Sequence, residues 1–205
     1  MRPPSTQKFA IVSDILHVVL PKKRTIQRIY LHCTAGSGGD AEEIDRIHRV
    51  ERHWRGIGYN FLINSGKNGF PAGIIQVGRP IDQVPANVRG DNTHSIGVSM
   101  VGNWDKESYL GPDLDRRIRS AFALIAHLAV KLHVKPANIL LHRMAASGPG
   151  VPNPGKSCPG NNFPDSFRPQ IIALMNDSLL RGKEFVEYNY FVVDLRSTNS
   201  GYKFI

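Results

Sequence analysis

Two apolar, strand-like runs that each end in a histidine constrain the fold of this chain more than any other feature. The runs are RIYLH, ending at His32, and NILLH, ending at His142. The ends of strands are places where a rigid sheet can direct side chains from distant parts of a sequence toward one point. A third reactive side chain, Cys158, follows in the pentapeptide KSCPG, which begins at Lys156. Two imidazoles, one thiolate and an open fourth position would form a catalytic zinc site.

The thiol of Cys158, with Lys156 two residues before it, is compatible with two chemistries. A thiolate with a cation nearby is a nucleophile, and it is also a ligand for a soft cation such as zinc. The three residues are far apart in the sequence, and the chain contains no compact H-E-x-x-H motif. The spacing therefore leaves both alternatives open.

The intervening segments alternate between strand and helix patterns. Strand patterns also cover 59–63, 74–77 and 95–101, and helix patterns cover 41–55, 113–132 and 164–180. Asp40 is the predicted N-cap of the first helix, and Pro112 lies near the start of the second. Strands interleaved with helices predict one α/β domain with a mixed β-sheet.

The first predicted helix has an apolar face and a polar face. Ile44, Ile47 and either Val50 or Trp54 are expected to face the core. Its arginines and the two histidines among them, His48 and His53, are expected to lie in solvent.

Charge and composition restrict the partners that this chain can have. The 205 residues carry a formal net charge of +9, which calls for an anionic partner. Nucleic acid and bacterial cell wall are both anionic. The basic residues are dispersed, and there is no nucleic-acid recognition motif or aromatic-basic platform, so we expect no nucleic-acid partner.

The sequence also bears on location and assembly. No stretch approaches the roughly 20 apolar residues that span a bilayer, and residues 1–5 lack the pattern of a signal peptide. We therefore expect synthesis in the cytoplasm, no membrane span and a monomer. One disulfide between the two cysteines is disfavoured in that setting. Cys33 follows His32 directly, so it is expected to face the core if His32 faces a site.

A series of short motifs occurs along the chain in one order. The series is YLHCTAG (30–36), Trp54, IGYNFLI (57–63), Gly78-Arg79, Asn92 with SIGV (95–98), VGN (101–103), His142-Arg143 and KSCPG (156–160). It resembles the zinc-dependent N-acetylmuramoyl-L-alanine amidases of type 2, which include phage lysozyme-type amidases and animal peptidoglycan recognition proteins. The resemblance covers roughly residues 28–167. It implies an α/β single domain with a central mixed β-sheet flanked by helices.

The resemblance also implies a function and a set of site residues. The expected reaction is hydrolysis of the amide bond between N-acetylmuramic acid and L-alanine in bacterial peptidoglycan. His32, His142 and Cys158 match the zinc ligands of the family, and Tyr59 and Lys156 match its catalytic residues. Thr34, Arg79 and His94 are further candidates for the substrate groove, and the alternative for Arg79 and His94 is a structural or solvated position.

The expected setting is a phage endolysin that is released from the cytoplasm of an infected host and acts on the cell wall in the periplasm. A bacterial wall-recycling amidase, an injected antibacterial amidase and a non-catalytic peptidoglycan-binding module are the alternatives. Non-catalytic relatives commonly lose the thiolate ligand, which this chain keeps. We place the catalytic domain at 26–182, an N-terminal lead-in at 1–25 and a β-rich appendage of unknown role at 183–205.

Two positions depart from the pattern of the family. Many phage-type members carry histidine where this chain has Asn60, and Pro85-Ala86-Asn87 replaces a Gly-Ala-His-like turn. The second change removes a histidine that often lies near the site. Substrate positioning or proton relay at this point is therefore in question, whereas the metal ligands are unaffected.

Overall fold

The computed structural model describes residues 21–145 and 156–181. Within these ranges the strands are β1 (Arg28–Cys33), β2 (Phe61–Ile63), β3 (Ile75–Val77), β4 (Ser95–Met100) and β5 (Ile139–Leu141). The α-helices are α1 (Ala41–Val50), α2 (Gly111–Leu114), α3 (Arg116–Lys131) and α4 (Arg168–Arg181). Single 3₁₀ turns at 92–94, 136–138, 142–144 and 165–167 precede or follow these elements. The predicted α/β domain is confirmed.

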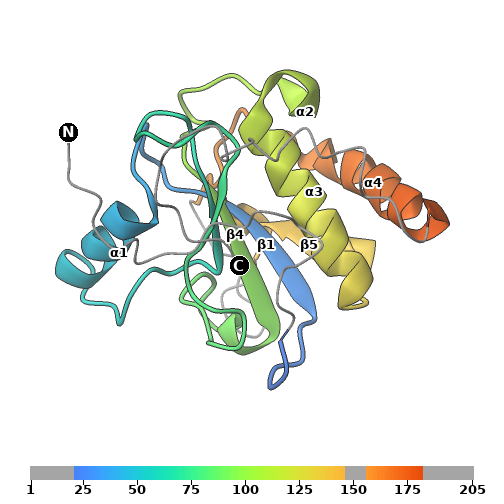
Figure 1. The fold of residues 1–205 in the computed structure, drawn as a ribbon, viewed down its shortest axis with the longest axis horizontal. Coiled ribbons are helices and arrows are strands. Elements are labelled where there is room, and N and C mark those ends of the chain that lie inside the picture. Colours follow the sequence, from blue (N-terminus) through green and yellow to red (C-terminus); the bar gives the residue numbers. More distant parts are fainter. Residues whose placement is uncertain (1–20, 146–155, 182–205) are drawn as a thin grey trace, which may run out of the picture.

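The five strands form one mixed sheet in the order β3-β2-β4-β1-β5. β2, β4, β1 and β5 run parallel, and β3 alone pairs antiparallel, with β2. Parallel neighbours require long crossover connections, which here contain α1 and α3. Figure 1 shows α3 and α4 lying side by side along the sheet, with α1 at the opposite end of the molecule.

Period-two alternation gives the sheet two different faces. Ile29 and Leu31 of β1 belong to the main core, together with Ile96 and Val98 of β4. That core is completed by the buried side of α3 and by aromatic residues after Cys158, including Phe163 and Phe167. The intervening residues of β1, Tyr30 and His32, point to the other face. This alternation leaves the second face of β1 available for a site.

The apolar residues of α1 pack on that second face. Ala41 and Ile44 form a small cluster with Ile57 and Leu62, which are not part of the main core. α1 ends at Val50, five residues earlier than predicted, because the chain turns back there. His53 takes a φ of 55°, and the backbone N–H of Trp54 donates to the carbonyl of His48. Of the two alternatives for the end of the apolar face, Val50 is exposed and Trp54 lies beyond the end of α1.

The segment predicted as one helix over 113–132 is two helices, α2 and α3. Asp115 between them has an extended backbone, and its carboxylate accepts the N–H of Arg117 as the N-cap of α3. α3 is almost entirely buried along its length, as expected for a helix between the sheet and α4.

The part of the lead-in that the structure describes is tied to the loop before β4. Lys22 and Lys23 donate their backbone N–H groups to Asp82. The guanidinium of Arg24 donates to carbonyl groups along the same loop, including those of Ile81 and Ser95. The other predicted lead-in residues, 1–20, and the predicted appendage at 183–205 lie outside the described residues.

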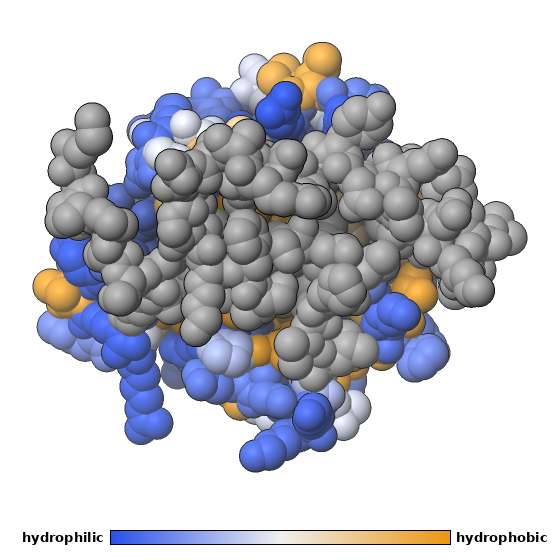
Figure 2. Space-filling view, viewed as in Figure 1, coloured by the Kyte–Doolittle hydropathy of each residue, from blue (hydrophilic) through white to orange (hydrophobic). Residues whose placement is uncertain are grey.

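Figure 2 shows a largely hydrophilic surface wherever the described residues are visible, with a small apolar patch over α2 at the top of the view. Leu110 and Leu114 are exposed there. Within the described ranges, no helix combines the length and the apolar character needed to cross a membrane.

Candidate metal centre and active-site groove

The pairing of β1 with β5 places two histidines side by side. Leu31 pairs with Leu141 in parallel register, so the next residues, His32 in β1 and His142 directly after β5, lie at the same end of these two strands. Their ring centroids are 4.4 Å apart. His32 is buried, whereas His142 lies in a 3₁₀ turn and is half-buried. Parallel strand ends therefore bring together two imidazoles that are 110 residues apart in the sequence.

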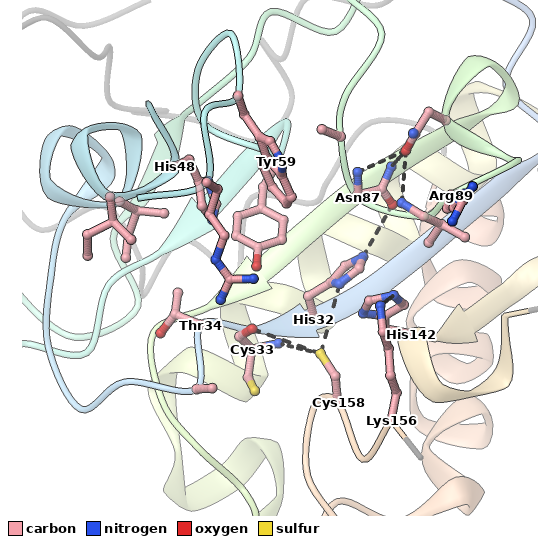
Figure 3. A pocket seen from close by; sticks show the side chains of 18 of the residues that line it. His32, Cys33, Thr34, His48, Tyr59, Asn87, Arg89, His142, Lys156 and Cys158 are labelled. Carbon is pink, nitrogen blue, oxygen red and sulfur yellow. Dashed lines mark hydrogen bonds between the residues drawn. The ribbon is translucent and has the colours of Figure 1, made fainter. Parts of the chain in front are cut away.

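Cys158 completes a cluster of three side chains with metal-binding atoms. Its Sγ atom lies 3.9 Å from Nδ1 of His32 and accepts the backbone N–H of Cys33 at 3.3 Å. One potential ligand atom from each of His32, His142 and Cys158 lies within 4.8 Å of the other two. Figure 3 shows the three side chains pointing toward one another. The predicted ligand set is thus brought together in space.

The loop that carries Cys158 is held by two charged residues. The backbone N–H of Arg143 donates to the carbonyl of Cys158, and its guanidinium donates to the carbonyls of Ser157 and Gly160. Asp105 accepts the hydroxyl of Ser157 at 2.6 Å and the N–H of Asn161 at 2.8 Å. These hydrogen bonds fix the backbone on both sides of Cys158, and none of them involves its sulfur atom.

Gly160 closes this loop against the core. Its φ is +133°, and a Cβ atom placed there would overlap the carbonyl carbon of Trp104. No other residue fits this backbone contact without displacing it. The glycine of the KSCPG motif is therefore required for the approach of the loop to Trp104.

Electrostatics favour neutral imidazoles in the cluster. Burial, and then the neighbouring His142, hold the pKa of His32 well below its usual range. Burial and the nearby Lys156 ammonium lower the pKa of His142 to about 4. Both rings therefore present a nitrogen lone pair at neutral pH, as a metal ligand must.

The pKa of the Cys158 thiol is shifted in the opposite direction, upward. The side chain of Cys33 and burial raise its pKa well above the usual value, while the N–H of Cys33 and the Lys156 ammonium lower it. Without a metal the thiol therefore stays protonated, and binding of a divalent cation would release its proton. Such a thiol is a poor free nucleophile. Of the two chemistries open to Cys158, the surroundings favour the metal ligand.

Lys156 and Tyr59 lie on either side of the cluster. Nζ of Lys156 is 3.4 Å from Nε2 of His142, and the rest of this side chain is exposed. The ring centroid of Tyr59 is 5.3 Å from that of His32. Burial raises the pKa of Tyr59, so its phenol is protonated at neutral pH. Both side chains can therefore donate a proton or a hydrogen bond to a group bound between them.

A groove of about 680 Å³ contains the cluster. Its walls include the cluster, Lys156, Tyr59 and Thr34, together with residues of α1 and of the loop before β4. Oγ1 of Thr34 accepts the N–H groups of Gly36 and Gly102, so this side chain also holds the turn at the end of β1. Among the described residues that line the groove, none is Asp or Glu, whereas Arg52 and Arg89 are cationic. The groove is accordingly suited to an anionic ligand.

Comparison with known proteins identifies this arrangement. The family model described as N-acetylmuramoyl-L-alanine amidase matches residues 22–161. The chain belongs to this amidase family.

Relatives of this chain include phage and animal proteins. The chain is 32% identical over 91 residues to an endolysin of Klebsiella phage KP32, covering 43% of this chain and 56% of that protein. It is 30% identical over 122 residues to peptidoglycan-recognition protein LB of Drosophila melanogaster, covering 59% of this chain and 45% of that protein. The chain thus matches about half the length of each of these relatives.

Solved structures agree with the fold. The amidase LysC of Clostridium intestinale superposes with a TM-score of 0.57 at 28% identity, covering 75% of this chain and 87% of that chain. Drosophila PGRP-LB superposes with a TM-score of 0.53 at 24% identity, covering 70% of this chain and 83% of that chain. At that lower identity the likeness concerns the fold alone.

Two residues assigned to the groove from sequence lie outside it. The Arg79 guanidinium donates to the carbonyls of Ile57 and Val84, so it fixes the two loops that approach one another there. His94 is exposed in the 3₁₀ turn before β4, and Nδ1 of its ring lies 3.4 Å from the carbonyl oxygen of Thr25. Neither residue lines the groove. The alternative that the sequence left for these two residues, a structural or solvated position, is the one found.

His48 is the opposite case, because it was expected in solvent and is buried against the groove. Its Nδ1 accepts the N–H of Gly58 at 3.0 Å. Its ring centroid lies 4.7 Å from that of Trp54 and 5.6 Å from that of Tyr59. The arginines around His48 in the sequence suggested a solvated helix face, and only the return of the chain after Gly56 buries this ring.

The two departures from the family pattern have different consequences. Asn60 is fully buried behind the groove and bridges β4 to the loop at 79–80, accepting the N–H of Gly97. Asn87 lies in the groove wall, with Oδ1 3.2 Å from Nε2 of His32. The first change is therefore structural, and the second lies next to the candidate metal centre.

The two cysteines are neighbours in the fold, because Sγ of Cys158 lies against the backbone and side chain of Cys33. Cys33 is buried in the main core, as the alternation along β1 predicted. Neither Cys33 nor Cys158 forms a disulfide within the described residues.

Proposed function

We propose that this chain is a zinc-dependent amidase that hydrolyses the bond between N-acetylmuramic acid and L-alanine in bacterial peptidoglycan. The observation that carries the proposal is the convergence of His32, His142 and Cys158, whose ligand atoms lie within 4.8 Å of one another. The chain belongs to an amidase family, and the three residues line an open groove.

The donor set fits zinc. Two imidazoles and one thiolate are ligands that zinc prefers, and a set of three leaves a fourth position open, as in catalytic zinc sites. The neutral state of both histidines meets the requirement for ligation. Zinc held by these residues would supply Lewis acidity, which activates water at neutral pH and polarises the amide carbonyl.

The protein residues around the cluster supply the remaining steps. We assign Lys156 the role of stabilising the negative charge that develops on the carbonyl oxygen, because its ammonium reaches the edge of the cluster beside His142. We assign Tyr59 to orienting the attacking water or the carbonyl, or to passing a proton to the departing amine. Its phenol remains protonated at neutral pH and lies on the His32 side of the groove. Thr34 would support the end of β1 next to His32.

The walls of the groove fit a peptidoglycan stem. Stem peptides carry carboxylates, and the described lining residues are free of acidic side chains and include Arg52 and Arg89. Trp54 also lines the groove and is 38% exposed, so its ring offers an apolar surface to a sugar or peptide. These features suit a sugar-linked anionic peptide better than an uncharged one.

The setting that we propose is a phage endolysin that reaches the cell wall after release from the host cytoplasm, because phage endolysins are among the relatives. A bacterial wall-recycling amidase and an injected antibacterial amidase would use the same site. A peptidoglycan-binding module without catalysis is the alternative from another class. The complete set of two histidines and one cysteine favours the enzyme over that module.

Turbidity of a peptidoglycan suspension tests the proposal. The purified protein is expected to clear the suspension and to release free amino groups. A chelator should abolish both effects, and added zinc should restore them. Clearing that persists in the chelator would refute the zinc-dependent mechanism, and binding without any release of amines would instead support the non-catalytic module.

A further inference from the structure

Asn87 occupies a defined place beside the candidate metal centre. It lies in the loop between β3 and β4, is 7% exposed and lines the groove. Its Cβ and Cγ atoms lie 2.9 and 3.0 Å from the position that a side chain on Gly97 would occupy. The bare backbone of Gly97 in β4 therefore lets this loop approach the sheet and brings Asn87 against His32.

The orientation of the Asn87 amide follows from the groups on its far side. Nδ2 of Asn87 lies 3.2 Å from Oδ1 of Asn92 and 3.3 Å from Oγ of Ser95. Oδ1 of Asn92 also accepts the backbone N–H groups of Asn87 and Val88, so it is an acceptor. Ser95 donates its hydroxyl proton to the carbonyl of Asp91 at 2.7 Å and presents a lone pair to Asn87. Two acceptors on that side require the NH₂ group there.

The amide oxygen consequently faces the ring of His32. Oδ1 of Asn87 is 3.2 Å from Nε2 of His32. A carbonyl oxygen accepts a hydrogen bond and cannot donate one, so a neutral ring in this position carries its proton on Nε2. The other nitrogen, Nδ1, then has a free lone pair, and it is this atom that lies 3.9 Å from Sγ of Cys158.

We propose that Asn87 is a positioning residue that holds His32 in the Nε2–H tautomer, with the Nδ1 lone pair directed at the metal position. The inference rests on the proposed zinc site. Partners of this kind orient metal-binding histidines in many proteins, and losing one typically lowers metal affinity by about 10–100-fold. Here the neutral amide of Asn87 takes that role.

The loop that carries Asn87 is itself held rigidly. Arg24 donates to the carbonyls of Asn92 and Ser95, which flank the acceptors of the Asn87 amide. Arg24, in the segment before β1, therefore fixes the loop that carries Asn87, and Asn87 in turn orients the ring of His32.

The test uses the full chain, labelled with ¹⁵N and free of metal, and reads the tautomer of His32 from two-bond ¹⁵N–¹H correlations of the imidazole. The wild-type protein should show a protonated Nε2 and a bare Nδ1. Asn87→Leu removes the acceptor at similar volume and should yield a mixture of tautomers. Zinc affinity, measured by competition with a coloured chelator, should fall about 10–100-fold.

Asn64→Leu is the matched control, because Asn64 is buried and its side-chain amide donates a hydrogen bond, but it does not line the groove. It should lower the melting temperature without changing the tautomer or the zinc affinity. A protonated Nδ1 in wild-type His32 would overturn the inference even if Asn87→Leu failed to fold. Wild-type tautomer and zinc affinity in a folded Asn87→Leu protein would overturn it as well. Neither readout requires turnover, so an inactive wild-type protein would refute the proposed function and leave this inference to be decided by the tautomer.

Discussion

His32 and His142 lie with ring centroids 4.4 Å apart because Leu31 and Leu141 pair in the parallel register of β1 and β5. The strand register is sufficient to bring both imidazoles to the same end of the two strands. Cys158 reaches the same point from a loop that Arg143 and Asp105 hold. The candidate metal centre is thus built from two rigid strands and one braced loop.

Removal of the thiol should separate metal binding from folding. Cys158→Ala is expected to lose zinc and turnover while the sheet stays folded, because the loop is fixed by backbone and Arg143 contacts rather than by the sulfur. Cys33→Ala is the control, because it removes a core side chain that also contacts the thiol of Cys158 but keeps the backbone N–H that donates to Sγ of Cys158. It should cost about 1 kcal/mol of unfolding free energy and keep zinc. Elemental analysis measures the zinc content of both variants, and a zinc-loaded Cys158→Ala protein would contradict the ligand assignment.

Lys156→Ala should impair the chemical step without removing the metal. Loss of one donor to a developing oxyanion typically lowers kcat by about 10²–10³-fold. The side chain is exposed, so the melting temperature should be unchanged. Lys106→Ala, an exposed lysine outside the groove, provides the control. Steady-state kinetics on a soluble muropeptide measure the effect, and a normal kcat would exclude Lys156 from catalysis.

Gly160→Ala should destabilise the protein far more than Gly69→Ala. Both glycines have positive φ, but a Cβ at Gly160 would strike the backbone of Trp104, whereas nothing lies within 4 Å of one at Gly69. We expect about 1 kcal/mol of lost stability for Gly69→Ala, from backbone strain alone. For Gly160→Ala we expect more than about 3 kcal/mol, because the loop that carries Cys158 must move. Denaturant unfolding measures both, and equal losses would contradict the packing of this loop.

Stability should fall as the solution becomes acidic. Burial, and then Arg52, lower the pKa of His48 to about 4, against about 6.5 in the unfolded chain. Between these values the unfolded chain binds a proton that the folded protein does not. The contribution of His48 is therefore complete above about pH 6.5 and is lost as the pH falls toward 4, by up to about 1.4 kcal/mol per pH unit.

His32 and His142 act in the same direction, because their pKa values are also lowered. His48→Gln removes one titrating group and keeps a side-chain oxygen for the N–H of Gly58. Its stability should therefore decline less steeply with acid than that of the wild type. Denaturant unfolding at several pH values tests this, and identical pH profiles would show that His48 does not titrate as a buried group.

The charge of the groove should be visible in substrate binding. Arg89→Gln removes an exposed cation from the groove wall, and KM should rise by about 2–5-fold, as for an exposed ion pair. The difference should shrink at high salt because exposed charges are screened. Arg46→Gln removes the same charge from α1 outside the groove and should leave KM unchanged. Equal effects of the two substitutions would mean that net charge, rather than the groove, attracts the substrate.

The sequence predicted those parts of the site that depend on periodicity. Alternation along β1 predicted that His32 and Cys33 face opposite sides of the sheet, and two apolar runs predicted the strands that end in histidine. The break at Asp115 was missed because an aspartate inside an amphipathic pattern can be either an exposed helical residue or an N-cap.

Residues whose roles depend on returning loops could not be predicted in this way. His48 lies among arginines in the sequence, and it is buried only because Gly58 folds back to donate to it. The sequence left two alternatives for Arg79 and His94, the groove or a structural or solvated position, and loop carbonyls hold Arg79 away from the groove. Asn87 was seen only as a missing histidine, since its contact with His32 depends on the bare backbone of Gly97.

Mass spectrometry of the products formed from a purified muropeptide tests the central claim most directly. The account predicts a free stem peptide that begins with L-alanine, together with a disaccharide that retains its lactyl carboxyl group. Formation of both products should cease in the Cys158→Ala protein. New reducing sugar ends on fragments that still carry their stem peptides, with no free L-alanine amine, would contradict the amidase function.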